Sequence, residues 1–261
     1  MAHQPAEIIS RHHWWHTIEL GPRLVTPGVW DIRHLPNQIP WPASLAGLRC
    51  LDIGTRDGFW AFEMERRGAG EVLAIDVDYA QMDTPYHLRE RQSSLSHSQQ
   101  PGETFNVLAE MLGSKATFKR LNIYDLKRAE VGQFDVIFVG YILHQLRDPL
   151  RALEIVRDVC RGCVIVLDEI MFFRSVFSRE PLARFGARRD FSEWFYFNAA
   201  GLRRVVEFAG FGVAASSPFL YYRRGPGVKL SELSLWTILK YTLGRAACSL
   251  AVRGEVSPDH V

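Results

Sequence analysis

The segment Asp52-Ile53-Gly54-Thr55-Arg56-Asp57-Gly58 constrains the fold more than any other part of this chain. It overlaps the end of a short apolar run, Arg49–Ile53, and Phe59 and Phe62 indicate a helix directly after it. A glycine-containing turn between a buried strand and a helix is typical of sheets that bind ligands at the carboxyl ends of their strands. The sequence therefore predicts an α/β fold with a ligand site at this turn.

Apolar runs and helical patterns alternate along the middle of the chain, which is typical of a parallel sheet covered by helices. Strands are predicted at 49–53, 72–75, 116–121, 134–139 and 164–167, and Val213–Tyr222 predicts a final antiparallel pair interrupted by Pro218. Asp148 with Pro149 marks one helix start, and Asn198 caps a helix that continues to Phe208. We therefore expect a Rossmann-like, mostly parallel sheet with an antiparallel final strand.

Three regions are expected along the chain. Residues 1–45 form an N-terminal arm or lid, because prolines at positions 22, 27, 36, 40 and 42 prevent a long helix there. Residues 46–225 form the ligand-binding domain, and residues 226–261 a C-terminal helical extension. Lys240 and Arg245 interrupt the apolar stretch 230–252, so it is expected to be an amphipathic helix and no transmembrane segment.

A polar connection at 81–103, rich in Ser and Gln, is expected to be a surface insertion. We expect residues 81–100 and the arm before Pro40 to move more than the sheet and to flank the ligand.

Charge and cysteine content exclude several classes of protein. A net charge of +2 with scattered basic pairs provides no continuous basic surface for nucleic acid. Four cysteines without a secretory signal indicate a reduced, cytoplasmic protein. Cys160 and Cys163 have the spacing of a redox or metal half-site, but no second pair follows, so no metal site is expected.

The chemistry of the turn favours a cationic ligand over a dinucleotide. The spacing is not Gly-x-Gly-x-x-Gly, and a carboxylate, Asp52, stands at the strand end. S-adenosyl-L-methionine carries an ammonium and a sulfonium but no phosphate, which suits glycines for close approach and an acidic residue nearby. Asp76, at the end of the second strand, is placed to accept two ribose hydroxyls.

The third strand is followed by Asn122-Ile123-Tyr124-Asp125, where Ile123 or Tyr124 would form an apolar wall for adenine and Asn122 or Asp125 would read its polar edge. The predicted cofactor-binding residues from the strand ends are Asp52, Gly54, Thr55, Arg56, Gly58, Phe59, Asp76, Val77, Asn122, Ile123, Tyr124 and Gly140.

Four segments carry a resemblance to a known family: LAGLRCLDIGTRDGFWAFEMERRGA, LGSKATFKRLNIYDL, FDVIFVGYILHQLRDPLRALE and FSEWFYFNAAGLRRVVEFAGF. Over residues 15–222 the chain resembles the class I S-adenosylmethionine-dependent methyltransferases grouped with the wobble-uridine tRNA methyltransferases. The segment HTIELGPRLVTPGVWD resembles the family's N-terminal segment, which implies that Thr26, Gly28 and Trp30 help to close the cofactor site.

One departure from this family bears on the cofactor. The enzyme that transfers a carboxymethyl group has a Tyr-His pair after the fourth strand, and this chain has Leu143-His144. Leucine cannot hydrogen-bond the extra carboxylate of carboxy-S-adenosylmethionine. The sequence therefore favours ordinary S-adenosylmethionine and weakens the tRNA interpretation.

His144 is the first candidate for a general base, against the alternative of a loop histidine that bonds only backbone. Glu169, after the fifth strand, is the second candidate, against the alternative of a solvated charge. His12, His13 and His16, with Trp14 and Trp15, are candidates to line an acceptor pocket from the arm.

These observations together predict a methyltransferase that acts on oxygen of a small-molecule or glycolipid-type acceptor. The alternatives are a tRNA-modifying methyltransferase and a non-catalytic ligand-binding relative. The oligomeric state stays open.

Overall fold

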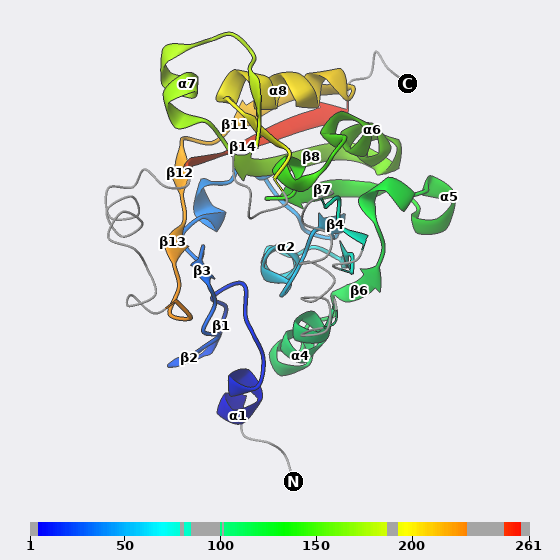
Figure 1. Cartoon of the computed structure of the whole chain (residues 1–261). Helices are drawn as coiled ribbons and strands as arrows, with labels where there is room; N and C mark the ends of the chain where they lie inside the picture. Colours follow the sequence, from blue (N-terminus) through cyan, green and yellow to red (C-terminus); the bar gives the residue numbers. More distant parts are fainter. Residues whose placement is uncertain are drawn as a thin grey trace.

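The structure is a computed structural model that describes residues 5–78, 81–84, 100, 102–186, 193–228 and 248–256. An eight-stranded sheet forms its centre, as Figure 1 shows. Its strands are β4 (Arg49–Ile53), β5 (Glu71–Asp76), β6 (Thr117–Arg120), β7 (Phe134–Gly140), β8 (Cys160–Glu169), β11 (Phe211–Ser216), β12 (Leu220–Tyr221) and β14 (Cys248–Val256). Their order is β11-β14-β8-β7-β4-β5-β6, with β12 paired to β14.

The five strands from β4 to β8 pair in parallel, which confirms the predicted parallel core. The chain builds outward from β4 through β5 to β6, and then crosses to β7 on the other side of β4. The strand order therefore reverses between β4 and β7. In open α/β sheets such a reversal opens the crevice in which ligands bind.

Helices cover both faces of the sheet (Figure 1). The helices are α2 (Phe59–Arg66), α4 (Glu103–Leu112), α5 (Arg128–Val131), α6 (Pro149–Val159), α7 (Phe172–Phe177) and α8 (Ala199–Phe208). Apolar side chains of α2 and α4 pack into one core, and those of α6 and α8 pack into the other. The predicted caps are confirmed: the Asp148 side chain accepts from the Arg151 N–H at 3.0 Å, and Asn198 accepts from the Gly201 N–H at 2.8 Å.

The N-terminal segment contains short elements, as its prolines predicted. They are α1 (Pro5–Ser10), β1 (Glu19–Gly21), β2 (Leu24–Val25), β3 (Trp30–Asp31) and η1 (Pro36–Gln38). Trp14 and Leu35 are 1% and 0% exposed and belong to the same core as α2. The segment is thus packed into the domain, and its action as a lid stays a prediction.

The prediction of a helical extension over 226–261 is wrong for residues 248–256, which form β14. This strand lies between β8 and β11 and is antiparallel to both. Leu250, Ala251 and Val252 are all buried, and periodicity cannot distinguish a fully buried strand from a buried helix. The predicted pairing within Val213–Tyr222 is corrected as well, since β11 and β12 each pair with β14.

Two predicted features fall largely outside the described residues: the rest of the C-terminal region, 229–247 and 257–261, and most of the insertion, 85–99. Among the described residues, no helix has the length and apolar character needed to cross a membrane.

Cys160 and Cys163 both lie in β8 as free, buried cysteines. Cys160 packs in the core beside α6, and Cys163 packs in the core beside α2. Residues three apart in a strand point to opposite faces of the sheet. The two thiols are therefore separated by the sheet, which argues against a dithiol or metal half-site.

Candidate functional site

The turn after β4 depends on two glycines in the left-handed region of backbone space. Gly54 has φ 79° and Gly58 has φ 90°. A Cβ on Gly54 would lie 2.4 Å from Cγ2 of Ile142, and one on Gly58 would lie 2.5 Å from Cε2 of Phe62. Ile142 follows β7, so the loops after β4 and β7 meet at Gly54. Any other residue at either glycine would be strained and would clash.

Asp76 lies at the end of β5 beside this turn. One carboxylate oxygen accepts the Arg56 N–H at 2.9 Å, and the other accepts the Val77 N–H at 2.8 Å. The residue is partly exposed. A carboxylate offers about four lone-pair sites, so both oxygens keep capacity for further donors. These free acceptor positions fit a pair of ribose hydroxyls that donate to them.

Asp52, Thr55 and Phe59 support the turn from inside. They are 1%, 2% and 8% exposed. The Asp52 carboxylate accepts the Ala61 N–H of α2 at 3.1 Å, and burial raises its pKa to about 7. The contact seen for Asp52 is thus with the helix, and the predicted contact with the amino acid end of a ligand stays a prediction.

The predicted adenine wall lies in a 3-10 turn, η4 (Ile123–Asp125), after β6. Asn122 caps this turn by accepting the Tyr124 N–H at 3.0 Å. Ile123 is 4% exposed and packs in the core, whereas Tyr124 is partly exposed and donates its hydroxyl to Asp83 at 2.9 Å. Of the two candidates for the wall, Tyr124 is the one that reaches the surface.

His144 lies in η5 (Leu143–Gln145), just after β7. Its Nδ1 is 2.5 Å from Oδ1 of Asp168 at the end of β8, and its backbone N–H donates to the other carboxylate oxygen at 3.1 Å. The alternative of a histidine that bonds only backbone is therefore wrong. Leu143 is fully buried in the core and offers no hydrogen-bonding group.

Burial lowers the pKa of the His144 imidazole, but the adjacent Asp168 carboxylate, with Glu169 and Glu193 nearby, more than offsets this and raises it to about 9. His144 is only 7% exposed, and its ring stacks on Tyr196 of β10 (Phe195–Phe197), with centroids 6.0 Å apart. The Trp194 N–H donates to the His144 carbonyl at 2.6 Å. The segment around β10 thus covers the imidazole.

Glu169, the second candidate base, is linked to Trp30 through Tyr222. The Tyr222 hydroxyl donates to the Glu169 carboxylate, and its ring meets Trp30 edge to face with centroids 4.4 Å apart. Burial raises the pKa of Glu169. The alternative of a fully solvated charge is wrong. Gly140 ends β7, where a Cβ would lie 2.8 Å from Cε1 of Phe138.

Asp57 connects the turn to the N-terminal segment. Its carboxylate accepts the backbone N–H groups of Trp15 at 2.5 Å and His16 at 2.7 Å, and the Thr104 hydroxyl at 2.8 Å. Asp57 is 3% exposed. Thr26 continues this network by donating to the His16 carbonyl at 2.6 Å, and a Cβ on Gly28 would lie 2.1 Å from the His16 carbonyl carbon.

The histidines of the N-terminal segment do not converge. His12 lies 3.4 Å from Glu103, His13 is exposed, and His16 is buried beside Asp57. Burial lowers the pKa of His16 to about 4, against the opposing effect of Asp57. Trp14 lies in the core, so it does not face an open pocket.

Sequence reasoning missed Asp57, Asp168 and Tyr222. Asp168 could have been recognised from the sequence, because it directly follows the predicted strand 164–167, and ligands bind at the carboxyl ends of such strands. Asp57 and Tyr222 act across the fold on residues more than 40 positions away, and no local pattern marks them.

A parallel sheet with a reversed strand order, a glycine turn and acidic strand ends defines the Rossmann-like fold of class I methyltransferases. The methyltransferase-domain family matches residues 29–216, and the chain belongs to it. The prediction of an S-adenosylmethionine-dependent methyltransferase is thereby confirmed. No protein of curated function matches the sequence.

Solved structures with this fold share little sequence with the chain. The N-terminal domain of EvdMO1, crystallised in the presence of S-adenosylhomocysteine and D-fucose, is 14% identical over 97% of each chain, with a TM-score of 0.56. A Haloferax volcanii putative methyltransferase in complex with the Trm112 activator is 13% identical over 88% of this chain and 89% of that one, with a TM-score of 0.52. The Burkholderia thailandensis 1,6-didemethyltoxoflavin-N1-methyltransferase is 14% identical over 81% and 72%, with a TM-score of 0.50. At these identities the likeness shows the fold alone.

Proposed function

We propose that the enzyme methylates a hydroxyl oxygen of a small-molecule acceptor, with His144 as the general base. The observation that carries this proposal is the pairing of His144 with Asp168, 2.5 Å apart, at the carboxyl ends of β7 and β8. β7 lies between β8 and β4, and the turn after β4 meets the loop after β7 at Gly54 and Ile142.

The strand ends fit S-adenosyl-L-methionine. Asp76 would take the two ribose hydroxyls, the turn from Gly54 to Gly58 would allow close backbone approach, and Tyr124 would flank the adenine. Trp30 would close the site from the N-terminal segment. When bound, this cofactor supplies a methyl group activated by the adjacent sulfonium charge.

The protein itself would position the acceptor and remove the proton from its hydroxyl group. Asp168 holds the Nδ1 side of the imidazole, and Nε2, which lies 3.4 Å from the Gln145 side-chain amide nitrogen, would accept the proton of an acceptor hydroxyl in place of that contact. Tyr196 stacks on the ring, and the burial of His144 limits access of water to it. Glu169, held by Tyr222, lies at the same strand end and would orient the acceptor.

Two features favour a small molecule over tRNA. The net charge of +2, with scattered basic residues, provides little attraction for a polyanion. Structures with this fold include an enzyme named as a 1,6-didemethyltoxoflavin methyltransferase and a domain crystallised in the presence of D-fucose. The grouping with wobble-uridine tRNA enzymes is the alternative that the following experiment addresses.

The test offers the purified enzyme methyl-labelled S-adenosylmethionine with a panel of small hydroxyl compounds, glycolipids and total tRNA. We expect label in one hydroxyl compound or glycolipid and none in tRNA. His144→Ala should then lower turnover about a hundredfold or more at unchanged cofactor affinity, while the exposed-histidine control His13→Ala stays at wild-type rate. Label in tRNA alone, or full activity of His144→Ala, would contradict the proposal.

A competition assay tests the choice of cofactor. Since Leu143 is buried and apolar, the added carboxylate of carboxy-S-adenosylmethionine gains no partner from it. We expect no preference for the carboxylated compound. A clear preference for it would show that another group binds the carboxylate and would restore the carboxymethyl-transfer alternative.

A further inference from the structure

Large apolar side chains project into solvent from α7 and from β9 (Ala183–Phe185). Phe173, Val176 and Phe177 of α7 are 60%, 50% and 82% exposed, and Phe185 of β9 is 74% exposed. The three residues on α7 are spaced three and four apart, so they share one face of the helix. Figure 1 shows α7 projecting at the edge of the molecule. Clusters of exposed apolar side chains of this kind mark interaction sites.

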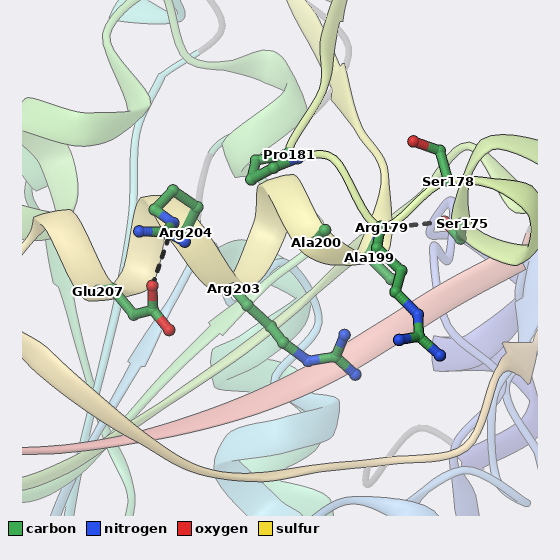
Figure 2. Close-up of a pocket in the computed structure, with 9 residues that line it drawn as sticks. All are labelled: Ser175, Ser178, Arg179, Pro181, Ala199, Ala200, Arg203, Arg204 and Glu207. Atoms are coloured by element: carbon green, nitrogen blue, oxygen red, sulfur yellow. Dashed lines mark hydrogen bonds and ion pairs between the residues drawn. The ribbon is translucent and has the colours of Figure 1, made fainter.

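A hollow of about 390 Å³ adjoins this cluster, between α7 and α8 (Figure 2). Its lining includes Ser175, Ser178, Arg179, Arg203 and Arg204. Figure 2 shows the guanidinium groups of Arg179 and Arg203 on the same side of the hollow. Arg204 pairs with Glu207 at 3.2 Å, and Arg203 uses its Nε to bond the Ser216 hydroxyl at 3.1 Å. The terminal nitrogens of Arg203 carry further donors.

The surroundings of the cluster are basic. Arg174, Arg179 and Arg184 are exposed between Phe173 and Phe185, and Glu180 is the one acidic residue in that stretch. Arginine binds phosphate oxygens through two parallel hydrogen bonds, and the Ser178 hydroxyl, which accepts the Glu180 N–H, adds a further donor. A partner that matches this face therefore offers an apolar layer and anionic groups, such as phosphates, at neighbouring positions.

We propose that this face docks on an anionic membrane surface. Phe173, Val176, Phe177 and Phe185 enter the interfacial layer, and Arg179 and Arg203 bind a lipid phosphate in the hollow. An acidic peptide would match the arginines but would not cover four projecting apolar side chains. A phospholipid bilayer supplies both an apolar layer for the exposed side chains and, next to it, phosphate groups for the arginines.

Docking through α7 and β9 would place β10, the strand that covers the His144 imidazole, near the membrane. α7 begins three residues after Glu169 in the chain. β9 pairs with β10, and Trp194, next to β10, bonds the His144 carbonyl. The membrane inference itself does not depend on the proposed methyl transfer, because vesicle binding is measured without any acceptor.

Sedimentation with vesicles tests the proposal, using phosphatidylcholine with about one third phosphatidylglycerol against phosphatidylcholine alone. The full-length protein should bind the anionic vesicles more tightly, and binding should weaken as salt rises. Phe173→Ser with Phe177→Ser should lower the partition coefficient about tenfold or more. Leu112→Ser is the control, since Leu112 is 38% exposed and ends α4, which Figure 1 shows at the opposite end of the molecule from α7.

Arg179→Ser with Arg203→Ser should lower binding to anionic vesicles and reduce its salt dependence, while Arg128→Ser on α5 should not. The proposal is overturned if the wild type does not bind anionic vesicles at low salt, or if the variant with Phe173 and Phe177 replaced binds as well as the Leu112→Ser control. Saturable binding of inorganic phosphate that needs Arg203, without vesicle binding, would identify a site for soluble anions and would also overturn it.

Discussion

The imidazole of His144 is bonded to a carboxylate and is shielded from solvent, and these two conditions act on its pKa in opposite directions. Burial disfavours the charged ring, whereas Asp168 favours it, and the net result is a pKa of about 9. At neutral pH the ring therefore carries a proton, and only the neutral fraction can act as a base. This sets the sign of the expected pH dependence.

We expect turnover to rise with pH from neutrality, by roughly tenfold per unit, and to level off above about pH 9. Asp168→Asn removes the charge that raises the pKa, so the rising limb should move to lower pH while the plateau falls about a hundredfold or more. Asp158→Asn, at an exposed position of α6, serves as the control. A rate that is flat between pH 6 and 9 in the wild type would contradict this assignment.

Replacement of Asp76 tests the proposed cofactor site. Asp76→Ala should weaken binding of S-adenosylmethionine by about 1.5 to 3 kcal/mol, because charge-assisted hydrogen bonds to two hydroxyls are lost. Calorimetry measures this, and a melting curve checks the fold, since Asp76 also bonds the Arg56 N–H. Asp78→Ala is the control, because the Asp78 carboxylate pairs with Arg120 at 3.1 Å. Equal affinity of the two variants would rule out the assigned role.

At the scale of elements, the N-terminal segment and the turn after β4 behave as one unit because Asp57 joins them. A buried carboxylate that accepts two backbone N–H groups and a hydroxyl is expensive to replace. The segment also carries Trp30, which reaches Glu169 through Tyr222. Movement of this segment would therefore change both the cofactor side and the acceptor side of the site.

Asp57→Asn should destabilise the protein by about 2 to 3 kcal/mol, because an amide cannot accept all three hydrogen bonds. Hydrogen exchange of residues 5–20 should accelerate more than that of β4 and β7. Asp125→Asn, at an exposed position after β6, should change neither. Exchange that increases equally throughout the sheet would show that Asp57 stabilises the whole domain and does not specifically hold the segment.

At the scale of the whole molecule, β14 completes the sheet from the C-terminal end of the chain. It fills the position between β8 and β11, so the sheet would otherwise be divided there. Gly254 allows this insertion, because a Cβ would lie 2.8 Å from both Phe211 Cβ and Val206 Cγ1. The outer layer formed by α8 thus depends on a strand far away in sequence.

Gly254→Val should lower the free energy of unfolding by about 1 to 3 kcal/mol through overpacking. Gly212→Val is a matched control on the neighbouring strand, because its Cβ would have the Glu255 carbonyl oxygen at 3.9 Å as its nearest contact. Urea denaturation followed by circular dichroism measures both. Equal stability of the two variants would show that β14 is not closely packed against α8.

The sequence by itself determined the elements whose signals are local. The apolar run at Phe134–Val139, the caps Asp148 and Asn198 and the glycines of the turn after β4 all act within a few residues, and each prediction matches the structure. The family and the class of enzyme follow from the same segments, because cofactor chemistry at the strand ends restricts their residue types.

Only the tertiary structure decided which distant residues meet. A strand such as β14 carries no mark of its neighbours, since backbone hydrogen bonds are the same for any partner, and its apolar run suits a helix equally well. Pairs such as His144 with Asp168, or Asp57 with the N–H of His16, join residues 24 and 41 positions apart. Their geometry arises from the packing of the sheet and its helices, which local periodicity does not encode.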